Sequence, residues 1–238
     1  MKGKPCLLIG KNALMEVLKH HPERIKKVLT AKNKDALLQQ LLEQKISVKQ
    51  VSKQYLNQLT QTDSHQSFAA YLRSRPRWDL RDFLRSQRSL SSSRILILDS
   101  ITDPHNMGAI LRAAECFGTN AVLWSKNRSP DITPVITKTS AGASELVPQI
   151  VVSNLAQAVS ECQKADYTVF TAEIDDKAAS LSDFSFPSRG VLILGSEGKG
   201  VQPLLSKMAD RKIYIPMAGR ISSLNVSQAA AVILSHWK

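Results

Sequence analysis

The sequence predicts an α/β protein with two domains, the second built on a parallel sheet that helices cover on both faces. Three observations favour this fold class. Short apolar segments alternate with helical patterns along the 238 residues. In the second half the apolar segments contain no polar residues, as is typical of strands buried on both sides. Residues 1–94 hold 19 Lys and Arg against 7 Asp and Glu, whereas residues 95–238 hold 13 of each, so the halves differ in charge.

The composition limits the classes of protein to consider. The net charge of +12 lies entirely in the first part, which favours a polyanionic partner such as RNA or DNA over a merely solvated basic face. The three cysteines are far apart and lack Cys-x-x-Cys spacing, which argues against zinc and favours a reducing cytoplasm. No segment approaches the ~18 apolar residues of a membrane span, and the N-terminus does not resemble a signal peptide. We therefore expect a cytoplasmic protein with neither a metal nor a membrane partner.

Residues 1–72 are expected to form a small α/β domain. Asn12 and Ser52 are suitable helix caps, and Pro22 ends the first helical pattern. The predicted strands span 6–10, 25–30, 47–51 and 67–71, and the predicted helices span 13–20, 35–44 and 52–59. Alternating strands and helices over so short a length indicate one compact module.

Residues 73–93 have the composition of a linker. They are rich in Arg and Ser and contain Pro76, and seven arginines fall between Arg73 and Arg94. Four apolar residues interrupt this polar stretch: Trp78, Leu80, Phe83 and Leu84. We expect them to belong to a helix that packs on a neighbouring element, while stacking of the aromatic rings on nucleobases remains open at this point.

Residues 94–238 are expected to form the larger domain. Its predicted strands span 95–98, 121–124, 146–151, 167–171, 191–194 and 213–215. Its predicted helices span 108–117, 132–139, 155–165, 201–208 and 225–237. Gly118 follows the first of these helices, where glycine commonly ends a helix.

Three loops of this domain follow apolar strands and precede helices: 99–108, 194–200 and 215–227. In open parallel sheets, ligands collect at the carboxyl ends of the strands. The loop Gly195-Ser-Glu-Gly-Lys-Gly lacks both the Walker spacing and the Gly-x-Gly-x-x-Gly pattern. Because Glu197 would repel phosphate, this loop favours a hydroxyl-bearing or cationic ligand, although an ordinary glycine-rich turn remains open.

Asn106 and Arg112 are six residues apart at the start of a predicted helix. Six helical residues turn through about 600°, so the two would not share a face if both were helical. If Asn106 still lies in the loop, both border one pocket, where arginine offers a planar fork to phosphate. A capping asparagine beside an unrelated surface arginine is the simpler interpretation and stays open.

Taken together, these segments resemble the three signature motifs of the SpoU (TrmH) family of RNA 2′-O-ribose methyltransferases. The motif residues are Asp103–Gly108 with Arg112-Ala-Ala, then Leu194–Gly198, then Ile215-Pro-Met with Ser223–Ser227. They occur in family order over residues 94–236. Residues 6–72, including Gly10–Ala13 and His65–Ser67, are similar to the ribosomal-protein-like RNA-binding domain of the ribosomal-RNA guanosine members.

The resemblance implies a SPOUT-type parallel sheet with a C-terminal trefoil knot, which binds S-adenosylmethionine, in a homodimer whose active site lies at the subunit interface. By motif position, backbone groups of Gly195, Ile215 and Leu224 would contact this cofactor. The expected catalytic residues are Asn106, Arg112, Glu197, Ser223 and Asn225. Since a guanidinium rarely loses its proton near neutral pH, we favour Arg112 as a phosphate anchor and electrostatic stabiliser. Proton abstraction by Arg112 stays open only if the nearby sulfonium favours its neutral form.

The implied activity is methylation of a ribose 2′-hydroxyl in RNA, with a guanosine of 23S ribosomal RNA as the favoured target. The basic first domain supports a large structured RNA because it adds phosphate contacts outside the active site. Two alternatives remain open from the sequence. One is a tRNA ribose 2′-O-methyltransferase, and the other is a non-catalytic RNA-binding or ribosome-assembly protein on the same fold.

Overall fold

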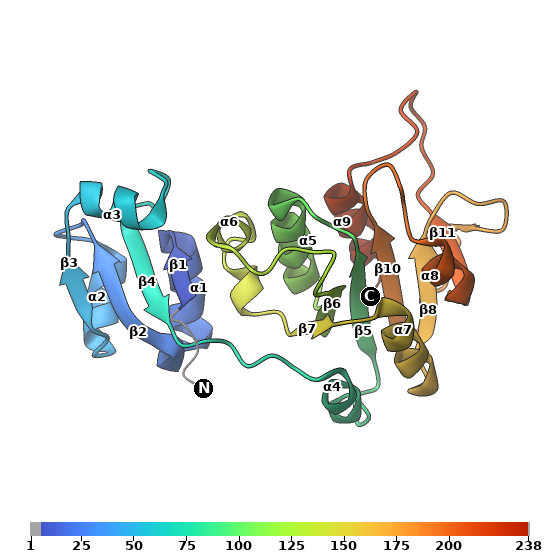
Figure 1. Cartoon of the computed structure of the whole chain (residues 1–238), viewed down its shortest axis with the longest axis horizontal. Coiled ribbons are helices and arrows are strands. Elements are labelled where there is room, and N and C mark those ends of the chain that lie inside the picture. The colour runs from blue at the N-terminus through green and yellow to red at the C-terminus, as the bar shows by residue number, and fades with distance from the viewer. Residues whose placement is uncertain (1–5, 238) are drawn as a thin grey trace. The chain divides into compact units, whose positions relative to one another are not determined.

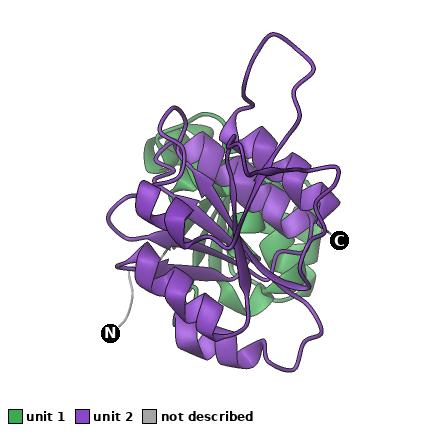
Figure 2. Cartoon of the chain, turned by 90° about the vertical axis from the view of Figure 1, so that its right-hand side faces the viewer, with its two compact units in different colours: residues 1–76, 132–146 green, residues 77–131, 147–238 purple. Residues whose placement is uncertain are grey.

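The computed structural model describes residues 6–237 and divides into two compact units, coloured separately in Figure 2. Unit 1 comprises Met1–Pro76 together with Ile132–Leu146, and unit 2 comprises Arg77–Asp131 and Val147–Lys238. The domain boundaries expected near residues 72 and 94 stay predictions. What the sequence did not indicate is that residues 132–146, from within the second expected domain, pack with the first unit.

Unit 1 is built on a mixed sheet of four strands in the order β1-β4-β2-β3, in which β4 runs antiparallel to both neighbours and β3 parallel to β2. Its elements are β1 (Cys6–Ile9), α1 (Lys11–His20), η1 (Pro22–Arg24), β2 (Ile25–Thr30), α2 (Ala36–Glu43), β3 (Val48–Gln50), α3 (Lys53–Thr60), β4 (Phe68–Leu72), α6 (Pro134–Thr139) and η2 (Ala143–Glu145). Each strand and helix predicted for residues 6–72 is therefore confirmed, and its ends differ from the predicted ones by two residues or fewer.

Alternation along the strands of unit 1 produces a core on each face of the sheet. Phe68, Ala70 and Leu72 of β4 pack with the apolar residues of α1 and α2. Ala69, between them, packs on the other face with Leu56 of α3. Because successive strand residues point to opposite faces, one short strand contributes to both cores.

The segment 132–146 is held in unit 1 by a buried ion pair. The guanidinium of Arg24 lies 2.7 Å from the carboxylate of Glu145, and the two residues are 7% and 3% exposed. Gly142 adopts φ +94° at a point where an added Cβ would lie 3.0 Å from Cα of Ala13 in α1. The segment thus packs closely on α1 at a position that requires glycine.

Unit 2 contains a parallel sheet of seven strands in the order β7-β6-β5-β10-β8-β11-β9 (Figure 1). Its elements are α4 (Leu80–Ser86), β5 (Ser93–Asp99), α5 (Pro104–Cys116), β6 (Ala121–Ser125), β7 (Gln149–Val152), α7 (Leu155–Lys164), β8 (Thr168–Ala172), β9 (Ala179–Ser180), β10 (Arg189–Gly195), α8 (Pro203–Met208), β11 (Arg211–Tyr214) and α9 (Val226–His236). The predicted parallel α/β sheet is confirmed, and β9 is a short edge strand that the sequence analysis missed.

Helices cover both faces of this sheet. Ile95 and Ile97 of β5 face a core that α4, α7 and α8 complete. Leu96 and Leu98 are also fully buried and point to the opposite face, where α5 packs against α9. Burial of consecutive residues explains why these strands are continuous apolar runs rather than alternating patterns.

The helix α4 lies within the stretch expected to be a linker. Asp79 caps it by accepting hydrogen bonds from the backbone N–H groups of Arg81 and Asp82. Leu80, Phe83 and Leu84 are buried in the core of unit 2. The expected packing role is therefore confirmed for these three residues, whereas Trp78 is 42% exposed.

A cluster of aromatic rings anchors the end of α9. Trp237 is 2% exposed, stacks on Phe186 at a centroid distance of 5.5 Å, and donates from its indole N–H to the carbonyl of Pro187 at 3.1 Å. Gly190 leaves room for the indole, because an added Cβ would lie 2.6 Å from Cζ2 of Trp237. Trp237 therefore fixes the C-terminal end of α9 against β10.

None of the helices in residues 6–237 has both the length and the apolar character to cross a membrane. Over the same residues, no group of three or more His, Cys, Asp or Glu side chains is arranged to hold a metal ion. The three cysteines are free, and burial raises the pKa of the Cys162 thiol to about 12.

We predict that Glu145→Ala lowers the free energy of unfolding by about 3–5 kcal/mol, because it leaves the buried Arg24 guanidinium without its counter-charge. The double variant Arg24→Met with Glu145→Leu should recover most of that loss, since it removes both charges and fills the space. Urea unfolding followed by circular dichroism measures both effects. A single variant as stable as the unmodified protein would show that the pair does not hold residues 132–146 in place.

Candidate active site at the carboxyl edge of the seven-stranded sheet

Three segments far apart in the chain meet at the carboxylate of Glu197. Its Oε1 atom accepts a hydrogen bond from the side-chain amide of Asn106 at 2.9 Å and a second from the side-chain amide of Asn225. Asn106 belongs to α5, Glu197 to the loop after β10, and Asn225 to the start of α9. The structure thus brings together one predicted catalytic residue from each of the three sequence motifs.

Helix capping orients the side-chain amide of Asn225. Asn225 is the N-cap of α9, and its Oδ1 accepts hydrogen bonds from the backbone N–H of Ser227 at 2.8 Å and from its hydroxyl at 2.6 Å. With its oxygen committed to the cap, the nitrogen of Asn225 donates to Glu197. Both ends of this side-chain amide are therefore used.

Asn106 lies in the first turn of α5 and not in the preceding loop. Asp103 caps the helix by accepting from the backbone N–H of His105 at 3.0 Å, and Pro104 occupies the first helical position. Both features start a helix, and α5 begins four residues before the predicted Gly108. Asn106 therefore does not occupy the loop position considered for it, and a pocket shared with Arg112 stays a prediction.

The loop that carries Glu197 is a tight hairpin. The backbones of Ser196 and Gly200 exchange hydrogen bonds of 3.1 and 2.9 Å. Gly198 and Gly200 both have positive φ. Gly195 ends β10, and a Cβ there would lie 2.0 Å from the carbonyl carbon of Gly200, so no other residue fits at this position without displacing the hairpin.

The exit of the hairpin is fixed by Asp99, which the sequence analysis did not single out. This carboxylate ends β5, is fully buried, and accepts the backbone N–H of Gln202 at 2.8 Å as well as the Gln202 side-chain amide. The Gln202 side chain also accepts from Arg128. The sequence does contain a signal for this role, since Asp99 is an acidic residue at the end of an otherwise apolar strand. A carboxylate buried there requires hydrogen-bond donors nearby.

The remaining predicted residues lie outside this hydrogen-bonded group. Arg112 is exposed on α5, and Ser223 is exposed in the segment between β11 and α9. Neither makes a hydrogen bond or ion pair to Glu197 within residues 6–237. Ile215 directly follows β11, and Leu224 directly precedes Asn225; both are partly buried. Gly195, Ile215 and Leu224 thus flank the loops that surround the group.

The arrangement is suited to a hydroxyl or a cation. A carboxylate only accepts hydrogen bonds, and Oε1 of Glu197 already has two donors. Its Oε2 atom has no partner in the described part of the chain and remains available as an acceptor. Gly198 beside it borders open space, since an added Cβ would meet no atom within 4 Å, so there is room for a second part of a ligand.

Two family models match the chain. The model described as the SpoU rRNA Methylase family matches residues 93–235, and the model described as RNA 2′-O ribose methyltransferase substrate binding matches residues 7–78. Among curated proteins, the 23S rRNA (guanosine-2′-O-)-methyltransferase RlmB of Acinetobacter baylyi is 33% identical, over 98% of this chain and 96% of that protein. The protein of the same name from Escherichia coli K12 is 34% identical over 96% of each.

Solved structures share the fold. An AdoMet-bound rRNA methyltransferase from Sinorhizobium meliloti gives a TM-score of 0.80 at 20% identity, over 98% of this chain and 86% of that one. The SpoU methyltransferase AviRb from Streptomyces viridochromogenes gives 0.79 at 21% identity, over 98% and 88%. At these identities the two likenesses establish the fold alone.

We predict that Gly195→Ala destabilises the protein by about 1–3 kcal/mol, because the added methyl group meets the backbone of Gly200. Gly219→Ala is the matched control, since a Cβ at Gly219 meets no atom within 4 Å. Thermal unfolding of both variants measures the difference. Equal melting temperatures would contradict the close packing of Gly195 against the hairpin.

Proposed function

The chain belongs to the SpoU rRNA methylase family, and we propose that it transfers the methyl group of S-adenosylmethionine to the 2′-hydroxyl of a guanosine in 23S rRNA. It is an RNA 2′-O-methyltransferase with S-adenosylmethionine as its cofactor. The observation that carries the choice of site is the shared hydrogen bonding of Asn106 and Asn225 to Glu197. It gathers all three motifs at one edge of the sheet, where parallel α/β proteins bind ligands.

The loops around Glu197 fit the cofactor. Gly195 sits where no side chain is accommodated, so a ligand would meet backbone there. We assign cofactor binding to backbone groups of Gly195, Ile215 and Leu224, which lie at the ends of two parallel strands and before α9. When bound, the cofactor supplies a sulfonium methyl group that a nucleophile attacks in line.

Within this proposal, Glu197 orients the ribose. Its free Oε2 atom accepts the hydrogen bond of the 2′-hydroxyl, which directs a lone pair of the hydroxyl oxygen away from the carboxylate. As the O–CH3 bond forms and the S–CH3 bond breaks, the hydroxyl proton passes to this carboxylate or to solvent water. Asn106, held by Glu197, limits the rotation of that carboxylate, and Asn225 does so from the opposite segment. Such orientation of the attacking atom accounts for a large part of the catalysis of bimolecular reactions.

Arg112 is assigned to the RNA backbone. It is exposed on α5 and has no ion-pair partner within residues 6–237, so its planar fork is available for bidentate binding of a phosphate. Ser223, exposed in the segment before α9, is assigned to the same ligand-binding surroundings.

We further propose the finer features that the family resemblance implies. The C-terminal segment is proposed to form a trefoil knot, which is supported by the order of strands: β8 lies between β10 and β11, yet α9 returns to pack on α5 and β10. We also propose that the protein is a homodimer in the cytoplasm. Residues 1–72 are proposed as the RNA-binding domain and 94–238 as the methyltransferase domain, which lends residues 132–146 to unit 1. The linker between them, 73–93, carries α4, which packs in the core of unit 2.

We predict that Asn106→Ala lowers kcat about 100-fold and changes RNA affinity only slightly, because the amide orients Glu197 and does not hold the RNA. The assay measures transfer of a labelled methyl group from the cofactor to a 23S rRNA fragment, with a filter-binding assay for affinity. Asn127→Ala is the control, since Asn127 is an exposed loop residue. No transfer by the unmodified protein to rRNA, or transfer to tRNA only, would refute the proposed function.

Arg112→Lys is expected to reduce kcat/KM for the RNA at least tenfold, because an ammonium group cannot make a bidentate contact with phosphate. The loss should appear mainly in KM and should diminish at low salt. Methylation near the unmodified rate would show that neither the fork nor any proton transfer at Arg112 is needed.

A further inference from the structure

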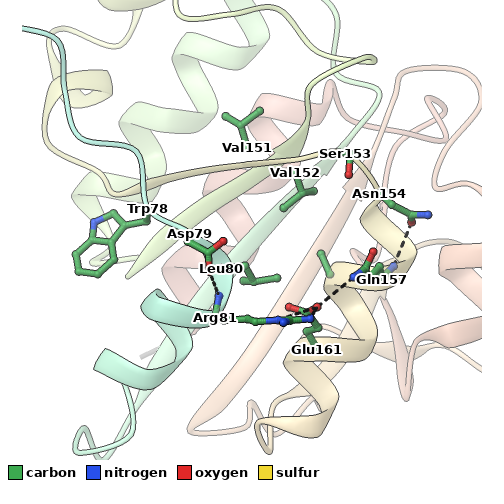
Figure 3. A pocket seen from close by; sticks show the side chains of 11 residues that line it. Trp78, Asp79, Leu80, Arg81, Val151, Val152, Ser153, Asn154, Gln157 and Glu161 are labelled. Atoms are coloured by element: carbon green, nitrogen blue, oxygen red, sulfur yellow. Dashed lines mark hydrogen bonds and ion pairs between the residues drawn. The ribbon is translucent and has the colours of Figure 1, made fainter. Parts of the chain in front are cut away.

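A groove runs between α4 and α7 on unit 2, away from the hydrogen-bonded group at Glu197. It consists of two cavities of about 370 and 460 Å³ that share Arg81, Gln157 and Glu161 in their walls. Figure 3 shows the first cavity, with Trp78 at one end and Asn154 at the other. Nothing in the proposed function uses this surface.

Trp78 presents an aromatic ring on a fixed backbone. The other two tryptophans, Trp124 and Trp237, are 1% and 2% exposed, whereas Trp78 is 42% exposed. Its backbone N–H donates to the carbonyl of Gln149 at 3.3 Å, which attaches the residue to the edge strand β7. Its ring also lies edge-on to buried Phe83 at a centroid distance of 5.9 Å. A large apolar surface is therefore held rigidly in contact with solvent.

The wall beside the ring combines apolar and amide groups. Leu80, Val151 and Val152 provide apolar surface. Asn154 uses its oxygen to cap α7, and Gln157 uses its nitrogen to donate to Glu161 at 3.3 Å. The Asn154 nitrogen and the Gln157 oxygen remain as one donor and one acceptor, the pairing that base edges require.

The second cavity is basic. Arg81 is paired with Glu161 at 3.0 Å and Arg85 with Asp82 at 2.7 Å, which neutralises both acids. Arg88 and Lys164 line the same cavity and have no ion-pair partner within residues 6–237. Two uncompensated cations thus lie along the groove beyond the aromatic end.

We propose that this groove binds a stretch of RNA, with a base stacked on Trp78 and the backbone following the cations Arg88 and Lys164. Sites that bind single-stranded RNA combine stacking aromatic rings with a basic path for phosphates, and both components occur here along one groove. The inference rests on the proposed function for its choice of RNA as partner. It gives unit 2 an RNA contact of its own, outside unit 1 and away from Glu197.

Fluorescence tests the stacking directly. Because Trp124 and Trp237 are buried, quenching by a short oligoadenylate reports on Trp78, and base stacking should quench it. Trp78→Ala should lose the quenching and weaken binding of the oligonucleotide about tenfold. Trp78→Phe should retain most of the affinity, since it keeps an aromatic face. Unchanged binding by Trp78→Ala would overturn the proposal.

A charge-reversal pair tests the phosphate path without altering the ring. Arg88→Glu with Lys164→Glu should weaken binding and reduce the slope of log K against log salt by about two. Lys177→Glu with Lys207→Glu is the matched control, because these exposed lysines line a different cavity. An equal effect of both pairs would indicate general electrostatics and would contradict a built site.

All binding is measured with the full chain and without cofactor, so the result is independent of methyl transfer. If methylation of rRNA proceeds while the Trp78 and Arg88/Lys164 variants bind RNA normally, the groove proposal fails alone. If these variants lose RNA binding but the unmodified protein transfers no methyl group, the groove stands and the proposed function fails.

Discussion

One carboxylate oxygen, Oε1 of Glu197, joins three segments that the sequence places far apart. The amides of Asn106 and Asn225 both donate to it, so the starts of α5 and α9 are held against the hairpin after β10. Two donors on one oxygen leave the other oxygen of the carboxylate available to a ligand. If this contact were lost, both amides would lose their partner and the three motif segments would no longer form one site.

Other parts of unit 2 hold the three segments in the positions that this contact requires. The parallel strands bring all three loops to one edge, but the loops alone do not determine where side chains point. Asp99 fixes the residue that leaves the hairpin, Gly195 lets the hairpin lie directly on β10, and Trp237 anchors the far end of α9. Three residues that could hardly be replaced by others, Asp99, Gly195 and Trp237, thus hold the exposed carboxylate of Glu197 in place.

Local patterns predicted most of the strands and helices because apolar runs and capping residues act over a few positions. They did not predict contacts between distant residues. The Arg24–Glu145 pair that holds residues 132–146 in unit 1 leaves no periodic signal, and neither does the shared hydrogen bonding at Glu197. Asp103 signals the start of α5 at Pro104, but the helix was predicted to begin only at Gly108. Asn106 was therefore considered a loop residue, whereas it lies in the first turn of the helix. Of the four apolar residues in 73–93, only burial in the structure separates Trp78 from the other three.

Part of the excess positive charge lies outside unit 1, on the basic residues that line the groove between α4 and α7. This distribution supports the proposals that the enzyme contacts a large RNA at several points and that Glu197 orients one ribose. The most direct test is to map ribose 2′-O-methylation across the ribosomal RNA of cells with and without the gene. We expect one 2′-O-methylguanosine of 23S rRNA to disappear when the gene is absent and to return with the unmodified gene but not with Glu197→Ala. Identical methylation maps in all strains would contradict the assignment.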